Sequence, residues 1–574
     1  MQISSSKSFS RKLTLYASIA ALSFTAVLAF SQTPASLRPA SLKPEDWFAR
    51  PYELPKDVFD LPEFDQFRKG TVLDVKAALT ALGVQSDQHL PLAQQYFDIF
   101  AWKAFIALNW PAKPDGQPDD SKTFGAIPLE TPLVWEFWQQ SSRIFLPDGS
   151  TPKWSGAPGA TLDHFKAGWR QNTTVNEGKQ AFSGPLVDQS GKWVHYVSLV
   201  NRPEFDYIAG DKEGRALYNL EGQAAYLQEH EIQFPENDDT HYGAIEIKFA
   251  WKFLTEPEVR SNRFLMKKLP VVEYRPSTAA EAPAHKSGNS KDNPASTTAP
   301  PQETLGLIGM HISMRTRSSP QWIWATIEHI DNTRLDFGSG DARHPLPAHP
   351  SLANPDNPNA LVGANLLPPY NAVPLPPLNT FSDWDESKPM SPVEVLRLVP
   401  PPQGTAEINR LAQAFLGSKN SVFRFYELNG TQWPKHPTAP AVPGGMPSGV
   451  SSAPDSIIRK MPGEMVPVYL TNATMETYFQ KGLQQAGPLE QDDRLLSQFS
   501  VDTNMVFGTE SCVGCHYSAG ACIGFQKDFY GKPMVDPDGN KIPIFGQNGH
   551  NGLNANGNFS WLLQLQAKAK HPKP

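Results

Sequence analysis

The chain has 574 residues, which is more than one ordinary hydrophobic core holds and predicts two or three domains. Only 19% of the residues are charged and the formal net charge is -7, which argues against nucleic-acid binding and against a polybasic membrane contact. The 55 prolines predict long irregular connections between helices and strands.

The first 31 residues have the pattern of a secretory signal peptide. Basic residues within positions 7–12 precede an uncharged, mostly apolar run over 13–30, and Ala29 and Ser31 provide a small-x-small cleavage site. The alternative is an uncleaved anchor, because such a run is close to the length that spans a bilayer. The many Ala, Ser and Thr residues in the run favour cleavage. We therefore expect export to the periplasm of a Gram-negative bacterium and no membrane span in the mature chain.

Residues 32–460 are predicted to form one mixed α/β main domain. Apolar residues at helical spacing predict helices over 72–82 and 92–108. Three aromatic residues within 135–138 indicate a further short segment that is buried.

The middle of this domain reads as strands. Runs rich in β-branched and aromatic residues, with alternating polarity, predict strands over 193–200, 244–253, 307–316 and 322–330. Residues 318–321 are expected to form the turn between the last two. Successive strands of this kind predict a large antiparallel sheet.

Two segments interrupt the domain. Residues 276–304 consist mainly of Ala, Ser, Thr, Pro, Asn and Lys without an apolar period, which predicts a disordered insertion. Repeated prolines predict an irregular excursion over 340–403. A helix over 406–416 with Thr405 as its N-cap, and then a strand over 422–428, are expected to follow.

Polar residues collect on one face of each of three predicted strands. If these faces converge, they form a pocket of mixed charge in an aromatic core. The alternative is a solvated sheet face, which is the ordinary reason for such alternation. The candidate catalytic residues are His311, Arg315 and His329, and their neighbours in the predicted pocket are Glu246, Lys248, Lys252, Ser313 and Glu328.

The sequence Cys512-Val513-Gly514-Cys515-His516 reads C-x-x-C-H, the attachment pattern of a c-type haem. Each of the two thiols can form a thioether with a haem vinyl group, and His516 can bind the iron as its proximal ligand. A disulfide, a redox dithiol and half a zinc site are the alternatives. A zinc site needs a second pair of ligands, whereas the third cysteine, Cys522, stands alone and is expected to be a buried thiol. We therefore expect one covalent haem c.

Residues 461–574 are expected to form a small α-helical haem region, with helices over 475–485 and 559–570 and with Asn558 capping the second. This order of helix, C-x-x-C-H and closing helix resembles a cytochrome c domain, and the expected fold class of the whole chain is α+β. The chain also resembles the large bacterial cytochrome c family proteins, which are exported and carry a single haem motif. That resemblance implies haem attachment at Cys512, Cys515 and His516, and it rests on residues 246–248, 250–252, 310–312, 322–326, 328–332, 511–516 and 559–563.

Two features depart from small cytochromes c. Their sixth iron ligand is usually a methionine well downstream of the motif, whereas Met534 lies close to it. We therefore predict His550, in a Gly- and Asn-rich loop, as the sixth ligand, with Met534 as the alternative and His311 or His329 as the next residues to test. Only 58 residues follow His516, so the N-terminal part is expected to supply one wall of the haem pocket.

These observations lead to one expected function and two alternatives. A haem with two protein ligands passes single electrons, so we expect electron transfer with a redox partner protein. A haem enzyme of the peroxidase or oxygenase kind would instead need an open iron position, acid–base groups beside it and a small-molecule substrate. A module that binds a ligand or partner and carries a redox haem is the third possibility.

Overall fold

The structure is a computed structural model, and it describes residues 43–68, 74–165, 186–210, 215–274, 302–335, 350–354, 392–397, 401–437, 465–467, 470–477, 512–516, 519–537, 539–546 and 557–570. The chain divides into two compact units, residues 1–49 and residues 50–574. The described part of the first unit holds one short helix, α2 (Pro44–Trp47), which begins at a proline. The predicted signal peptide lies outside the described residues.

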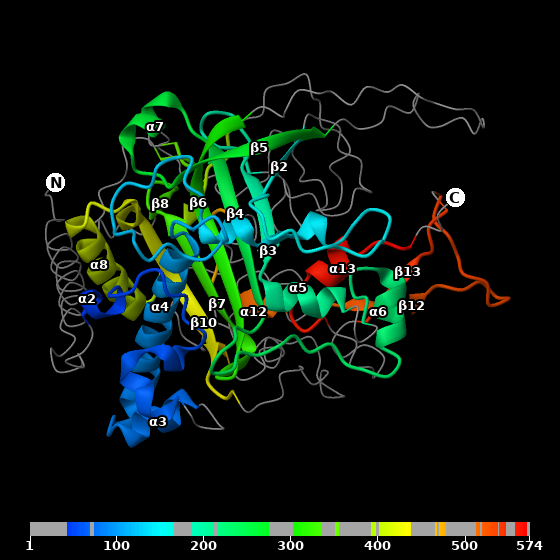
Figure 1. Cartoon of the computed structure of the whole chain (residues 1–574), viewed down its shortest axis with the longest axis horizontal. Coiled ribbons are helices and arrows are strands. Elements are labelled where there is room, and N and C mark those ends of the chain that lie inside the picture. The colour runs from blue at the N-terminus through cyan, green and yellow to red at the C-terminus, as the bar shows by residue number, and fades with distance from the viewer. Residues whose placement is uncertain are drawn as a thin grey trace, which may run out of the picture. The chain divides into compact units, whose positions relative to one another are not determined.

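A large sheet forms the centre of the second unit (Figure 1). Every described pair of neighbouring strands in it is antiparallel except the parallel pair β2–β5. The structure thus confirms the α+β class and the large antiparallel sheet. Its main path runs in the order β1 (Gln139–Gln140), β3 (His195–Val200), β4 (Ile245–Phe253), β6 (Gln302–Thr316), β7 (Ser319–His329), β10 (Tyr426–Pro434) and β11 (Met465–Val466), while β5 (Met266–Tyr274) joins β6 and β2 (Leu162–Phe165) joins β5.

The strand register places the predicted polar residues opposite one another. Lys248 of β4 pairs with His311 of β6, and Glu246 pairs with Ser313. Ser313 in turn pairs with Trp324 of β7. Residues directly opposite in an antiparallel pair project from the same face of the sheet, so the predicted polar faces of β4 and β6 are one face.

Helices α4 (His89–Leu108) and α8 (Gln403–Ser418) pack on the opposite face of the sheet. The ring of Phe97 in α4 stacks on Trp433 of β10 with 4.6 Å between centroids. The indole N–H of Trp102 donates to Asn409 of α8 over 2.9 Å, which ties the two helices together. The aromatic residues that predicted α4 are therefore core residues of this layer.

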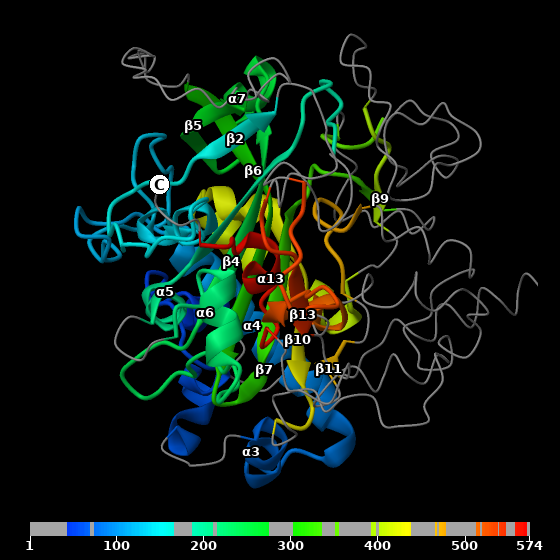
Figure 2. The same ribbon diagram turned by 90° about the vertical axis from the view of Figure 1, so that its right-hand side faces the viewer.

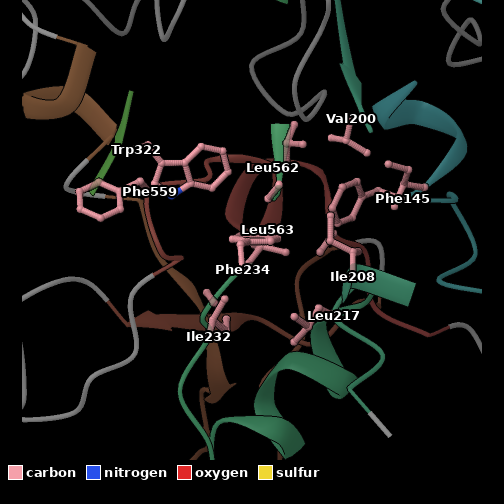
Figure 3. Packing of buried hydrophobic residues seen from close by; sticks show 14 of the residues in the cluster. Phe145, Val200, Ile208, Leu217, Ile232, Phe234, Trp322, Phe559, Leu562 and Leu563 are labelled. Carbon is pink, nitrogen blue, oxygen red and sulfur yellow. The ribbon is translucent and has the colours of Figure 1, made fainter. Parts of the chain in front are cut away.

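The polar face is covered by two helices between β3 and β4 and by segments near the C-terminus (Figure 2). These are α5 (Arg202–Ala209), α6 (Leu220–Tyr226), α12 (Cys512–His516), the hairpin of β12 (Ala521–Phe525) and β13 (Pro543–Gly546), and α13 (Leu562–Gln566). Their apolar residues form one buried cluster with residues of the sheet (Figure 3). Among the labelled members are Val200, Ile208, Trp322, Phe559, Leu562 and Leu563.

Short elements complete the described chain. None of its helices is both long and apolar enough to cross a bilayer. The remaining elements are η2 (Val58–Asp60), η3 (Pro62–Phe67), α3 (Val75–Ala81), η4 (Ser86–Gln88), η5 (Val134–Phe137), η6 (Ser141–Arg143), α7 (Glu256–Ser261), β8 (Arg334–Leu335), β9 (Leu396–Arg397) and η7 (Val422–Phe425).

The structure corrects three local predictions. Helix α8 begins at Gln403 after Pro402, and the hydroxyl of Thr405 is inside it, donating to Asp98 over 2.6 Å instead of capping the helix. The predicted strand over 422–428 starts as the 3₁₀ helix η7. The turn between β6 and β7 is shorter than predicted, because Thr316 already pairs with Ser319.

The C-terminal region is less helical than predicted where it is described. Helix α13 spans five residues only, and Asn558 does not cap it, because the N-cap position is Trp561. Together with the five-residue α12 and the β12–β13 hairpin, it packs on the sheet and does not form a helical layer of its own. The insertion 276–304 lies almost wholly outside the described residues, as does most of 340–403 and of 475–485.

Candidate haem site

The two thiols and the imidazole of the haem motif lie on one turn of helix α12. Residues three and four apart share one face of a helix, so Cys512, Cys515 and His516 project to the same side. The backbone N–H of Val513 donates to the side chain of Gln432 over 2.9 Å, which fixes the helix to strand β10. None of the three cysteines, all of them in the described part, forms a disulfide.

The imidazole of His516 is oriented by the backbone. Its Nδ1 donates to the carbonyl oxygen of Phe559 over 2.6 Å, so Nε2 is left as the ring nitrogen that can bind a metal. Burial lowers the pKa of His516 to about 4, which keeps the ring neutral at physiological pH. The indole of Trp324 packs on it with 4.5 Å between ring centroids. A neutral ring whose second nitrogen is bonded to a carbonyl is the usual state of a histidine that binds a metal.

The carbonyl that orients His516 lies in an unusual turn. Asn558 and Phe559 have positive φ angles of 48° and 73°, which are costly for residues other than glycine, above all for an aromatic one. The side-chain oxygen of Asn558 holds the turn by accepting from the backbone N–H of Phe234 and from Arg315. The strain is thus offset by contacts from β6 and from the segment before β4.

Arg315 was a predicted catalytic candidate, and the structure places it in this support. Its guanidinium is 3% exposed, donates to Asn558 over 3.0 Å and forms an ion pair with Glu236 at the same distance. It also donates to the carbonyl of Phe234. Arg315 therefore positions the turn that orients His516, with its two terminal nitrogens bonded to Phe234, Asn558 and Glu236.

His311, Lys248 and Glu476 form a charged group beside the motif. The Nε2 atom of His311 lies 3.4 Å from a carboxylate oxygen of Glu476. Burial acts to raise the pKa of Glu476, but His311, the backbone N–H of Asn472 and Lys248 together outweigh it and lower that pKa below its ordinary value. The charges of all three also act on the pKa of His516. The predicted polar faces of β4 and β6 therefore meet on one face of the sheet, beside the motif.

Two other predicted residues belong elsewhere. His329 follows Glu328 in β7 and projects from the other face of the sheet, where its ring stacks on Phe264 at 4.0 Å. Its nitrogens bond to backbone groups of Arg263 and Asp331, which identifies a structural histidine. Lys252 is buried in an ion pair with Glu258 of 2.5 Å, at the far end of β4.

Glu328 also has a structural environment. It is fully buried, and Arg397 donates to one of its oxygens over 2.9 Å. The other oxygen accepts from the backbone N–H of Ala473 and from Asn429. Glu328 thus attaches the segment 470–477, which carries Glu476, to the sheet.

The candidates for a sixth ligand are less well placed. Met534 is 42% exposed on the arm that extends from β12 and β13, and His550 lies outside the described residues. His311 is the one named alternative whose side chain is on the motif's side of the sheet.

Cys522 is a buried thiol, as predicted. It is fully buried in β12, and its backbone N–H donates to Gln223 over 2.8 Å. Burial raises its pKa to about 11, so the group is a thiol at neutral pH.

Several residues of this site could not be found in the sequence. The acceptor for His516 is a backbone carbonyl, which any residue type can supply. Trp324 belongs to the strand predicted over 322–330, which gives it no role of its own, and Glu476 belongs to the helix predicted over 475–485. Glu204, with Asn201 before it as N-cap, has the signature of an exposed first helical turn, yet it is fully buried.

The donor set fits a covalently attached haem on this chain's own evidence. The thiols share a helical turn, no disulfide consumes them, and the histidine beside them is neutral with its outer nitrogen bonded to a carbonyl. No protein-family model matches the chain, and neither the curated proteins nor the solved structures give a match.

Proposed function

We propose that this protein is an exported c-type cytochrome that transfers electrons through one haem, attached at Cys512 and Cys515 and bound by His516. The observation that carries the proposal is the bond from His516 Nδ1 to the Phe559 carbonyl, next to two thiols that are not in a disulfide. A neutral histidine with this outer bond is the arrangement expected of an iron ligand. The haem, when bound, accepts and releases single electrons.

The chain's own residues would set the environment of that group. Cys512 and Cys515 would tether it, Gln432 holds the motif helix in place, and Phe559 fixes the ring of His516. Trp324 comes from strand β7, so the sheet contributes a wall beside the proximal histidine. This contact supports a haem region built jointly from the sheet and the C-terminal segments, in place of a separate helical domain.

The test is covalent attachment after export with a competent maturation system. The double variant Cys512→Ser, Cys515→Ser should lose the haem in denaturing solvent, whereas the wild type should keep it on a denaturing gel and show the added mass. Cys522→Ser is the matched control, because it removes a thiol outside the motif, and it should retain the haem. A wild-type chain without covalent haem would contradict the proposal.

A haem enzyme is the second candidate, and the His311–Glu476 pair favours it. This pair is partly buried and its charges act on the motif histidine, so it could move a proton close to the haem. Carbon monoxide added to the reduced protein separates the two functions. Ready binding would show an open iron position and support the enzyme, whereas no binding supports electron transfer.

The sixth ligand decides the same question by a second route. We propose His550, although the exposed Met534 is the alternative. His550→Ala should convert a low-spin haem to high spin, while Met534→Leu should leave the spectrum unchanged. The reverse result would assign Met534, and an unchanged spin state in both variants would direct the test to His311→Ala.

A further inference from the structure

Glu204 is a buried carboxyl whose acceptors are unused. It lies in the first turn of α5 and is 0% exposed. Neither of its carboxyl oxygens has a hydrogen-bond partner within the described residues. Burying an ionised carboxylate without a partner is very costly. The carboxyl of Glu204 must therefore be protonated, or lie beside a group that carries a proton.

The fold places Glu204 beside Glu246. The side-chain oxygen of Asn201 accepts from the backbone N–H of Glu204 and from that of Ile245, in both cases over 3.1 Å. One atom thus connects the start of α5 with the residue before Glu246 on β4. The two carboxyls are close enough for the charge of Glu246 to act on the pKa of Glu204.

The side chains around this pair decide how much positive charge and how many hydrogen bonds it receives. Strand β3 places the apolar Val200 opposite Glu246. Ser560, Lys248 and His311 act to lower the pKa of Glu246, whereas the pKa of Glu204 is set by burial and by Glu246. Ser313 of β6 lies opposite Glu246 in the sheet. The hydroxyl of Ser560 donates to Glu246 over 3.0 Å. Arg315 is also near, but it is bonded to Glu236 and Asn558.

These groups leave the pair short of positive charge. Burial raises the pKa of Glu246 to about 7 despite Ser560, Lys248 and His311, and burial together with Glu246 raises the pKa of Glu204 well above its ordinary value. Two carboxyls in one buried site do not both ionise near neutral pH. The pair therefore retains at least one proton in that range.

The pair is also linked to the motif histidine through two consecutive residues. Ser560 bonds to Glu246, and the carbonyl of the preceding Phe559 accepts from His516. We propose that Glu204 and Glu246 form a single-proton site whose occupancy is coupled to the oxidation state of the iron bound by His516. This inference rests on the proposed function.

The coupled step balances in charge. One electron from a one-electron donor protein would reduce ferric iron to ferrous iron, so the positive charge near the pair would fall by one. A carboxylate oxygen of the pair would then form an O–H bond to a proton from a hydronium ion of the solvent, whose own O–H bond breaks to leave water. Oxidation releases the same proton. The sign follows from electrostatics, because a lost positive charge favours the protonated carboxyl.

The first measurement is the midpoint potential of the purified holoprotein between pH 5.5 and pH 8.5. The potential should fall as the pH rises, by up to about 59 mV for each tenfold drop in proton concentration. Glu246→Gln and Glu204→Gln should each flatten this dependence. Asp206→Asn is the matched control, since Asp206 is an exposed carboxylate of the same helix α5, and it should keep the wild-type slope.

The second measurement is the infrared difference spectrum between the oxidised and reduced protein. The C=O stretching band of a protonated carboxylic acid, identified by its shift in D₂O, should grow on reduction and vanish in both glutamine variants. A flat potential in the wild type, or a slope and band that survive both substitutions, overturns the coupling. A chain without covalent haem overturns it together with the proposed function, and the denaturing gel distinguishes that case from the others.

Discussion

Two fully buried glutamates on the same side of the sheet have opposite surroundings. Glu328 accepts from Arg397, Ala473 and Asn429, so both of its oxygens are used. Glu204 has no partner for either oxygen within the described residues and faces a second carboxyl. Burial alone therefore does not distinguish structural from functional carboxyls here. The difference is whether each carboxyl oxygen has a hydrogen-bond donor.

The same contrast separates the two buried histidines. His329 is enclosed by Phe264 and bonded on both nitrogens to backbone groups. His516 uses one nitrogen for the Phe559 carbonyl and keeps the other. Both carboxyl oxygens of Glu328 and both ring nitrogens of His329 thus have hydrogen-bond partners. The carboxyl oxygens of Glu204 and one ring nitrogen of His516 have none among the described residues.

The largest effect is expected at the paired carboxylate. Glu328→Ala leaves Arg397 facing Glu427 alone and removes the acceptor of the Ala473 N–H, which should lower the free energy of unfolding by about 3–5 kcal/mol. Urea denaturation measures it. The exposed Glu256→Ala is the control and should change stability by less than about 0.5 kcal/mol. A small loss at Glu328 would remove the contrast with Glu204.

The paired histidine should make stability depend on pH. Burial lowers the pKa of His329 to about 4, against about 6.5 in an unfolded chain, so the unfolded state binds more protons between these values. Stability should therefore be complete above pH 6.5 and fall by about 3 kcal/mol as the pH decreases to 4. His329→Gln should flatten this part of the urea-denaturation profile, and the exposed His230→Gln should not.

A substitution in the turn that orients His516 should lower the free energy of unfolding by an intermediate amount. Asn558→Ala loses two hydrogen bonds and places alanine at positive φ, which should lower stability by about 2 kcal/mol. Asn420→Ala is the matched control, because Asn420 has a φ of 52° but is exposed, and it should cost about 1 kcal/mol. In the holoprotein, Asn558→Ala should also perturb the haem spectrum. Equal losses and an unchanged spectrum would contradict the support role.

The smallest effect, with the opposite sign, is expected at the unpaired carboxyl. The folded-state pKa of Glu204 is raised, so its ionisation costs stability as the pH rises from its unfolded value of about 4.3 through the folded one. Glu204→Gln should therefore match the wild type at pH 4 and be more stable than the wild type at pH 8. A loss of stability at pH 8 would show that Glu204 is satisfied in solution.

Much of this arrangement was predictable from local pattern. Strands β4 and β6 have strict polar–apolar alternation, and α4 has apolar residues at helical spacing, so their existence and their faces followed from the sequence. The haem motif is a contiguous signal. Once the two strands pair, Lys248 and His311 must share a face.

The rest depended on contacts between distant segments. His329 is next to Glu328 in sequence, and only the side of the sheet that each faces separates their environments. Thr405 precedes a helical pattern as an N-cap does, but its bond to Asp98 of α4 draws it into the helix. Helix α13 is short because Asn558 and Phe559, which begin the helical pattern, form a turn with positive φ.

Strands β5 and β6 pair across the segment 275–301, with Pro270 opposite Gln302. The sheet thus holds Pro270 and Gln302, which flank that segment, opposite each other. The entropy of closing a loop grows only with the logarithm of its length, so doubling the segment costs about 0.6 kcal/mol. This makes the position a graft point, where a fluorescent reporter or an affinity tag can be inserted between two strands without a change in their register.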